Sequence, residues 1–343
     1  MTFTAVAWGA AALTGASLLL VLVIAGRRIV FAHEDERRRR AEDRLRPVAL
    51  ALVSGEELGE QALTEEDAVT VASLLARYAR QLAGSARENV AAYFERHGYV
   101  EREVSRLRDR HDWRRARAAY TLGDMGSQRA VEPLLRALGD ESRAVRAAAG
   151  RSLGRLEAVD AVAPLVAALV EGRVPRAVAG NALLSIGPSS LPRLRALAGH
   201  PDAETRTVVI ELIGLLGDAA DAPLVSEGLR DSSAEVRAKA TRALGRLGAA
   251  EAAGELRAAL DDRIPFVRAT AAIALGMIGD RDAAPALLAQ ARTDEFDPGQ
   301  AAARALAQVD TPLLWDAARR LGQGPHVAEA ADLTAVRRLP APA

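Results

Sequence analysis

One recurrent arginine has the type and spacing that most invite a chemical interpretation. A row of guanidinium groups offers paired hydrogen bonds to carboxylates or phosphates, so it could bind an extended anion or join successive structural units. Packing must repeat in every unit, whereas a ligand site involves one or two, so strict recurrence favours the structural role. We therefore predict a structural ladder, which recurs every 30 or 31 residues at Arg115, Arg146, Arg176, Arg206, Arg237 and Arg268.

Groups that could carry catalysis or hold a metal are sparse. The chain has no cysteine, which excludes disulfides, thiolate zinc sites and a cysteine nucleophile. Its five histidines are scattered, and His33-Glu34 is the one His-Glu dipeptide. No glycine-rich phosphate loop, GxSxG elbow or HExxH motif occurs. The sequence therefore predicts no catalytic residue, no cofactor and no metal.

A local basic stretch from Arg102 to Arg117 surrounds Trp113. Over the whole chain, 45 Lys and Arg balance 45 Asp and Glu, so there is no overall field that would attract nucleic acid. No aromatic residue, on which bases could stack, lies between Thr121 and Pro265. We predict no nucleic-acid binding. For the stretch from Arg102 to Arg117 we favour a solvated edge near anionic lipid head groups over a specific phosphate site. Whether the stretch binds lipid or another ligand stays open.

A repeat of about 31 residues must position these groups. The string LGDMG at 122–126 returns as LGRLE at 153–157, LLSIG at 183–187, IGLLG at 213–217, LGRLG at 244–248, LGMIG at 275–279 and LAQVD at 306–310. The pattern of each unit predicts two helices. The first helix is expected to end at the last glycine of the string, and that glycine is expected to adopt a left-handed conformation. The composition agrees, because hydrophobic residues make up 50% and aromatic residues only 3%.

In most units the second helix begins near a proline. Six units share this feature, at Pro133, Pro164, Pro192, Pro223, Pro285 and Pro312. Aspartates close the units and can cap the helix that follows, at Asp140, Asp202, Asp231 and Asp262. Ser232 with Glu235 fits a capping box. Upstream, Thr64 is expected to start a helix over about residues 65–81.

The first-helix pattern Val-Arg-x-x-Ala-x-x-x-Leu-Gly-x-[Leu/Ile/Met]-Gly, followed by a proline-initiated helix, resembles the HEAT-repeat superfamily. The resemblance is to short bacterial repeats of the phycobilin-lyase-like type and covers about residues 109–322. It implies an all-α, right-handed α-solenoid in which stacked helix pairs supply the core. Such solenoids mostly serve as binding scaffolds, so the resemblance implies protein binding and no enzymatic activity.

The same resemblance places the second helices along a concave surface that a partner protein would contact. The candidate partner-binding residues on these helices are Arg136, Arg193, Arg195, Glu227, Arg257 and Gln290. The alternative is an enzyme or enzyme subunit of phycobilin-lyase-like type, which would need a lined tetrapyrrole pocket. HEAT-type deoxyhypusine hydroxylases hold iron through several His-Glu pairs, whereas the single pair here lies outside the repeats.

The N-terminal segment 5–26 carries no charge and, as a helix of about 33 Å, would cross a hydrocarbon core of about 30 Å. Arginines follow it from Arg27 to Arg46 and none precedes it, which predicts a single-pass cell-membrane protein with its N-terminus outside. The expected domains are a transmembrane helix (5–26), a charged juxtamembrane segment (27–48), a helical cap with a degenerate repeat (49–108), the repeats (109–322) and a disordered tail (323–343). The predicted function is a membrane-anchored cytoplasmic scaffold for a protein at or near the membrane, of open oligomeric state.

Overall fold

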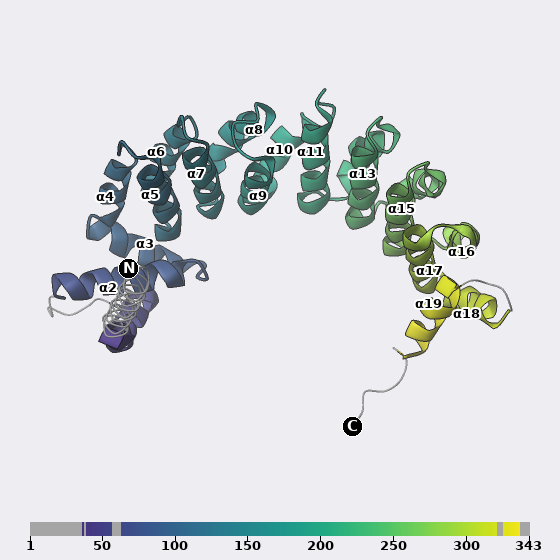
Figure 1. Cartoon of the computed structure of the whole chain (residues 1–343), viewed down its shortest axis with the longest axis horizontal. Coiled ribbons are helices and arrows are strands. Elements are labelled where there is room, and N and C mark those ends of the chain that lie inside the picture. Colours follow the sequence, from purple (N-terminus) through teal and green to yellow (C-terminus); the bar gives the residue numbers. More distant parts are fainter. Residues whose placement is uncertain (1–35, 38, 57–62, 321–324, 337–343) are drawn as a thin grey trace, which may run out of the picture. The chain divides into compact units, whose positions relative to one another are not determined.

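The computed structural model describes residues 36–37, 39–56, 63–320 and 325–336 (Figure 1). These residues form helices and turns with no strand among them, which confirms the prediction of an all-α fold. The chain divides into two compact units. Unit 1 holds the described residues up to Arg102 together with Asp124–Ser127, and unit 2 holds Glu103–Gly123 and the described residues from Gln128 onward.

Unit 1 is a small helical assembly. Its helices are residues 39–54, α2 (Glu65–Ala79), α3 (Ser85–Arg96) and α4 (Tyr99–Arg106), the last of which ends in unit 2. Thr64 caps α2 and accepts a hydrogen bond from the Asp67 amide at 3.2 Å, as the sequence predicts. Ion pairs of Arg44 with Asp67 (2.5 Å) and of Arg77 with Glu42 (2.8 Å) tie the helix at 39–54 to α2. Part of the charged segment 27–48 is therefore a packed helix.

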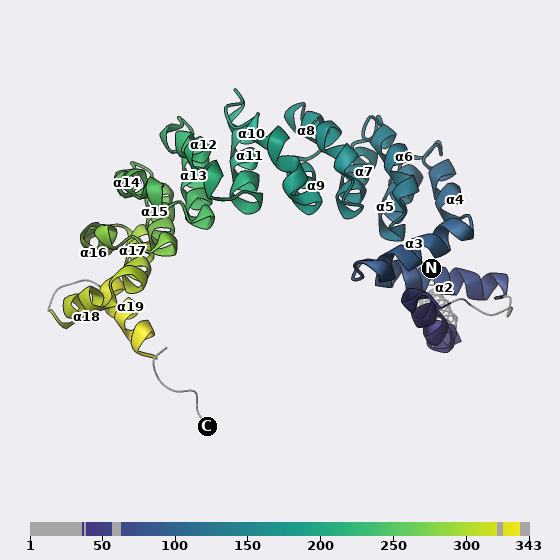
Figure 2. The ribbon, with the colours of Figure 1, turned by 180° about the vertical axis from the view of Figure 1, so that it is seen from behind.

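Unit 2 is a row of helix pairs, each made of a first and a second helix (Figures 1 and 2). The first helices are α5 (Asp112–Met125), α7 (Arg143–Arg155), α9 (Arg176–Ile186), α11 (Ala203–Leu216), α13 (Ala234–Leu247), α15 (Pro265–Ile278) and α17 (Phe296–Val309). The second helices are α6 (Val131–Ala137), α8 (Val162–Val170), α10 (Leu191–Arg195), α12 (Ala222–Glu227), α14 (Ala253–Ala258), α16 (Ala284–Thr293) and α18 (Thr311–Arg319). A final helix, α19 (Pro325–Val336), follows.

Short 3-10 helices connect or extend these elements. They are η1 (Gln128–Ala130), η2 (Val159–Ala161), η3 (Gly187–Ser190), η4 (Ala219–Asp221), η5 (Gly228–Arg230), η6 (Ala250–Ala252), η7 (Ala259–Asp261) and η8 (Arg281–Ala283). Most of them lead directly into a second helix, and the six prolines then fall at its second or third residue, as predicted. Within unit 2 the row bends toward the first helices in both views, so the expectation that second helices line the concave side is wrong.

The glycine that follows the buried leucine of the repeated string lets neighbouring first helices approach closely. A Cβ atom added to Gly245 would stand 2.9 Å from Cα of Ala274, and one added to Gly214 would stand 2.7 Å from Cα of Ala243. Real Cβ atoms essentially never come that close to backbone. The glycine is therefore required by inter-repeat packing.

The ends of the first helices follow the predicted left-handed conformation in most units. Gly248 ends α13 with φ 66°, and Glu157 adopts φ 52° at the equivalent place after α7, where a side chain is strained. The prediction is wrong for Gly217, which ends α11 in an extended conformation with φ −82°.

The capping pattern differs from the predicted one. Ser232 and Glu235 form no capping box: the N-cap of α13 is Ser233, which makes no side-chain capping bond. The capping box lies instead at the start of η4, between Asp218 and Asp221. Of the four aspartates expected to cap, Asp202 is an N-cap, for α11.

The prediction of a disordered tail over 323–343 is wrong for residues 325–336, which form α19. Val327 and Ala330 are buried, and the Trp315 indole donates a hydrogen bond to Thr334 Oγ1 at 2.9 Å. A Cβ atom on Gly299 would stand 2.8 Å from the His326 ring, so the glycine that interrupts the arginine row leaves space for α19. This helix covers α17, the first helix of the final pair, as a capping element does in a solenoid.

The predicted localisation needs correction. Among the described residues, no helix is both long enough and apolar enough to cross a bilayer. This finding contradicts the prediction of a single-pass cell-membrane protein with a cytoplasmic solenoid. The predicted span itself, residues 5–26, lies outside the described residues.

Candidate functional site

The recurrent arginines bridge successive repeats of unit 2. Nε and Nη2 of Arg206 donate to the two carboxylate oxygens of Asp231 at 2.7 and 2.8 Å, while Nη1 donates to the carbonyls of His200 and Pro201 at 2.7 and 2.8 Å. Each such arginine ties the loop before its own helix to the loop before the next first helix. The same paired geometry joins Arg115 to Asp140, Arg237 to Asp262 and Arg268 to Asp294.

Two members of the row differ. Arg176 contacts Asp202 through one nitrogen at 3.1 Å and Glu204 through another at 2.5 Å. Arg146 donates to the backbone carbonyl of Arg173 at 2.7 Å, because the loop after α8 has no aspartate at the equivalent place. The row is thus built from carboxylate and carbonyl acceptors of the following unit, which is the geometry of a structural ladder.

The ladder aspartates also organise the start of the next first helix. Asp231 accepts a hydrogen bond from the Ser233 amide at 2.8 Å, and the hydrogen bond from Arg206 lowers the pKa of its carboxyl group. Hydrogen bonds from the Thr205 hydroxyl and amide lower the pKa of Asp202 to about 2. Arginine hydrogen bonds likewise lower the pKa values of Asp262 and Asp294.

These shifts predict acid sensitivity. A carboxyl group whose pKa is lower in the folded than in the unfolded chain binds protons preferentially when unfolded, so it stabilises the fold above its unfolded pKa of about 3.9. That contribution is lost as the pH falls through the folded pKa. The urea midpoint should therefore decline between about pH 5 and pH 2, and Asp231→Asn should flatten that decline. An equally steep decline in the variant would show that Asp231 does not contribute to it.

The six candidate partner-binding residues all lie on second helices, but they do not share one free surface. Arg195 pairs with both carboxylate oxygens of Asp221 at 2.6 and 3.0 Å, and Asp221 is only 3% exposed. Arg257 pairs with Asp280 at 2.7 Å. Gln290 is 8% exposed and donates to Asp294 at 3.0 Å. These three side chains are therefore engaged within the protein, although Arg195 itself is exposed.

The other three candidates are exposed. Arg136 pairs with Glu132 one turn away on α6 at 2.9 Å. Arg193 and Glu227 have no partner among the residues that the structure describes. A partner-binding role for the six residues stays a prediction.

The basic stretch around Trp113 is largely satisfied within the protein. Arg106 pairs with Glu103, and Arg115 belongs to the ladder. Arg114 lies over the Trp113 ring, 5.1 Å from its centroid, and pairs with Asp109 at 3.2 Å. Hydrogen bonds, chiefly from the His111 amide, lower the pKa of Asp109 to about 2.

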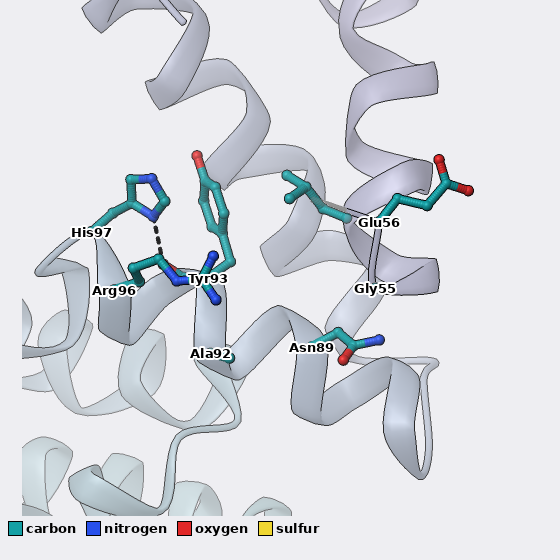
Figure 3. Close-up of a pocket in the computed structure, with 8 residues that line it drawn as sticks. Gly55, Glu56, Asn89, Ala92, Tyr93, Arg96 and His97 are labelled. Carbon is teal, nitrogen blue, oxygen red and sulfur yellow. Dashed lines mark hydrogen bonds between the residues drawn. The ribbon is translucent and has the colours of Figure 1, made fainter. Parts of the chain in front are cut away.

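Unit 1 contains a cavity of about 330 Å³ beside α3 (Figure 3). Tyr93 and His97 line it with their rings tilted by 32° and their centroids 4.3 Å apart, and His97 Nδ1 lies 2.9 Å from the Tyr93 carbonyl. The Tyr93 hydroxyl is buried and has no hydrogen-bond partner among the described residues. Burial, and then the neighbouring Tyr99, raise the pKa of Tyr93 to about 12.

Tyr93→Phe is expected to leave stability unchanged or to raise the free energy of unfolding by up to about 1 kcal/mol. The replacement keeps the ring and removes a buried hydroxyl that makes no hydrogen bond. Urea unfolding followed by circular dichroism measures the change. A loss of more than about 1 kcal/mol would mean that the hydroxyl has a partner in solution.

The described residues contain no group of three or more His, Cys, Asp or Glu side chains that could hold a metal ion. His33-Glu34 lies outside these residues.

A second set of side chains, which we did not single out from the sequence, points away from the core of unit 2. Residues two before and two after the buried leucine of each first helix (Ile213 on α11) lie about 200° from it around the helix axis. On α13 this pair is Arg242 and Arg246, and on α15 it is Ile273 and Met277, all of them exposed. We call these outward positions of the first helices the first-helix surface. The spacing i, i+4 opposite each core leucine was the signal that could have revealed it.

Together, the helix pairs and their arginine ladder define an α-helical repeat protein. The family model for HEAT repeats matches residues 101–184 and 222–307, so these parts of the chain consist of HEAT repeats. No curated protein matches its sequence.

Solved structures with similar folds include YibA of Escherichia coli, with 17% identity and a TM-score of 0.45 over 82% of this chain and 100% of that one. Human deoxyhypusine hydroxylase in complex with glycerol has 22% identity and a TM-score of 0.32, over 80% and 98% of the two chains. The complex of CpcE and CpcF of phycocyanin lyase from Nostoc has 21% identity and a TM-score of 0.27, over 83% and 94%. Similarities this low carry no argument about function.

Proposed function

We propose that this protein is a non-enzymatic scaffold that holds a partner protein on the exposed surface of its HEAT repeats. The observation that supports the proposal most directly is the first-helix surface. It recurs at equivalent positions on α11, α13, α15 and α17, which pack against one another in sequence. A surface that extends across several helices suits the area of a protein partner, about 800 Å² on each side.

The distribution of charge supports the same proposal. The ladder arginines are engaged with carboxylates and carbonyls inside the row, so their role is to join repeats. The hollow of about 600 Å³ near the end of α16 is lined by ladder residues, including Arg268 and Asp294, which pair with each other. On the first helices, the exposed Arg242, Arg246 and Arg304 have no ion-pair partner among the described residues and are available for contact with another molecule.

Site-directed photocrosslinking in the native cells, with the full chain, tests the proposal. A photoreactive amino acid at Gln308, which is exposed on α17, should trap one or a few defined proteins. The same group at Arg193 on α10 samples the second-helix layer. The rival activity is that of a phycobilin-lyase-like enzyme or enzyme subunit. Purified protein with a bound tetrapyrrole absorbance, or transfer of a tetrapyrrole to an acceptor cysteine, would overturn the scaffold proposal in favour of that enzyme.

A further inference from the structure

We propose that an acidic protein segment with interspersed apolar side chains docks on the first-helix surface of α11 to α17. This inference rests on the proposed scaffold function and deepens it by naming the surface and the chemistry of the partner. The residues that define the patch are Leu215, Arg242, Arg246, Ile273, Met277 and Arg304.

The patch carries uncompensated positive charge. Arg242 and Arg246 on α13 and Arg304 on α17 are exposed, and none has an ion-pair partner among the residues that the structure describes. The ladder arginines, by contrast, are engaged with acceptors of the next repeat. Three free guanidinium groups across two helices favour a partner that supplies carboxylates, because each pairing is charge-assisted and complementary potentials set the association rate.

The acidic side chains of these helices do not cancel the patch. Glu211, at the equivalent position on α11, pairs with Lys239 at 2.7 Å. Glu235 and Asp297 lie in the first turns of α13 and α17, seven residues before Arg242 and Arg304, which is about 10 Å along the helix axis. On α13 and α17 the negative and positive side chains therefore form separate bands, and an acidic segment is directed to the C-terminal halves of these helices.

Apolar side chains lie between the arginines. Ile273 is 46% and Met277 51% exposed on α15, which packs between α13 and α17 (Figure 2). Leu215 on α11 extends the apolar surface with 45% exposure. Methionine adapts to varied apolar partners, and arginine stems add further apolar area. None of the six residues is aromatic, so the patch offers no stacking platform for bases and favours a protein segment over nucleic acid.

The dimensions set the length of the segment. First helices that pack side by side lie about 8–10 Å apart, so the three steps from α11 to α17 span about 25–30 Å. A helical segment of about 18 residues has that length.

Fluorescence anisotropy with the full chain of 343 residues tests the inference. The probe is a labelled peptide of about 18 residues composed of Glu, Leu and Ala, beside a matched peptide with Lys for Glu and an oligothymidine strand. The patch variant is Arg242→Glu, Arg246→Glu and Arg304→Glu. The matched control is Arg193→Glu, Arg281→Glu and Arg292→Glu, which makes the same charge change at exposed arginines in and beside the second helices. Circular dichroism verifies that each variant retains its helices.

The acidic peptide should bind the native chain. Its affinity for the patch variant should be about tenfold lower, and its affinity for the control variant should lie within about twofold of the native value. Ile273→Ser with Met277→Ser should weaken binding about fivefold without altering its salt dependence, since it removes no charge. The Lys peptide should not bind.

Three results would overturn the inference. One is full binding by the patch variant with loss in the control, which would move the site to the second-helix layer. Another is tighter, patch-dependent binding of oligothymidine, which would make the ligand a nucleic acid. The third is no binding of the acidic peptide to the native chain. In that case the scaffold proposal stands if the photocrosslinker at Gln308 still traps a defined protein, and it fails with the inference if the crosslinker traps none.

Discussion

Gly245→Leu is expected to lower the free energy of unfolding by about 2–4 kcal/mol. Leucine is a far better helix former than glycine, so local propensity alone would stabilise α13 by about 0.8 kcal/mol. The added Cβ would, however, stand 2.9 Å from Cα and 3.0 Å from Cβ of Ala274 on α15. The two helices must separate to admit it, which costs more than propensity contributes. Urea unfolding monitored by circular dichroism measures the difference.

The same substitution at Gly254 is the matched control. This glycine is exposed on α14, and an added Cβ would meet nothing within 4 Å, so Gly254→Leu should not lower stability and should raise it by up to about 0.8 kcal/mol through helix propensity. Adding Ala274→Gly to Gly245→Leu should restore part of the loss by returning space at the contact. Equal effects at Gly245 and Gly254 would show that the close approach of α13 and α15 is not maintained in solution.

Arg206→Ala is expected to cost about 1–3 kcal/mol of stability, the second largest effect. The side chain makes four hydrogen bonds, two of them to the largely buried carboxylate of Asp231. Truncation removes two donors from that carboxylate, which keeps only its hydrogen bond from the Ser233 amide, and it removes the side-chain donor of the His200 and Pro201 carbonyls. Arg206→Lys should recover only part of the loss, because an ammonium group keeps the charge but cannot reproduce the planar fork.

Arg242→Ala is the control for the ladder. Arg242 is exposed on α13 and has no ion-pair partner among the described residues, so its removal should cost less than about 0.5 kcal/mol. Arg195 is unsuitable as a control, because it pairs with the buried Asp221. A double-mutant cycle of Arg206→Ala with Asp231→Asn measures the coupling directly. Negligible coupling would mean that the ladder contributes nothing to stability.

The elements of the repeats were predictable because their signals are local. The signals are apolar side chains that recur every three to four residues, a glycine at the end of the helix and a proline in the first turn of the next helix. Each signal acts on a few neighbouring residues. Thr64 and the six second-helix prolines accordingly lie where the sequence places them. The N-cap at Ser233 differed because several neighbouring polar residues can cap and the backbone geometry selects among them.

The tail shows where local signals fail. Residues 325–336 lack the repeated glycine string, and their apolar residues are mostly alanine, which predicts little about burial by itself. In the structure, Val327 and Ala330 are buried, and Trp315 bonds to Thr334, so a tertiary surface stabilises the helix.

The sequence by itself determined that this protein is a row of stacked helix pairs with an arginine recurring in all but the last, because the repeated strings and the residues that start and end helices can be read from the order of residues. Only the tertiary structure decided which side chains are free. Arg195 and Arg242 look alike in the sequence, yet Arg195 meets Asp221 from the next repeat and Arg242 faces outward. Gly245 and Gly254 also look alike in the sequence, yet Gly245 packs closely against Ala274 of the next repeat and Gly254 has open space around its Cα. The deciding partners lie about 25–30 residues away along the chain, and stacking of the repeats brings them within contact distance.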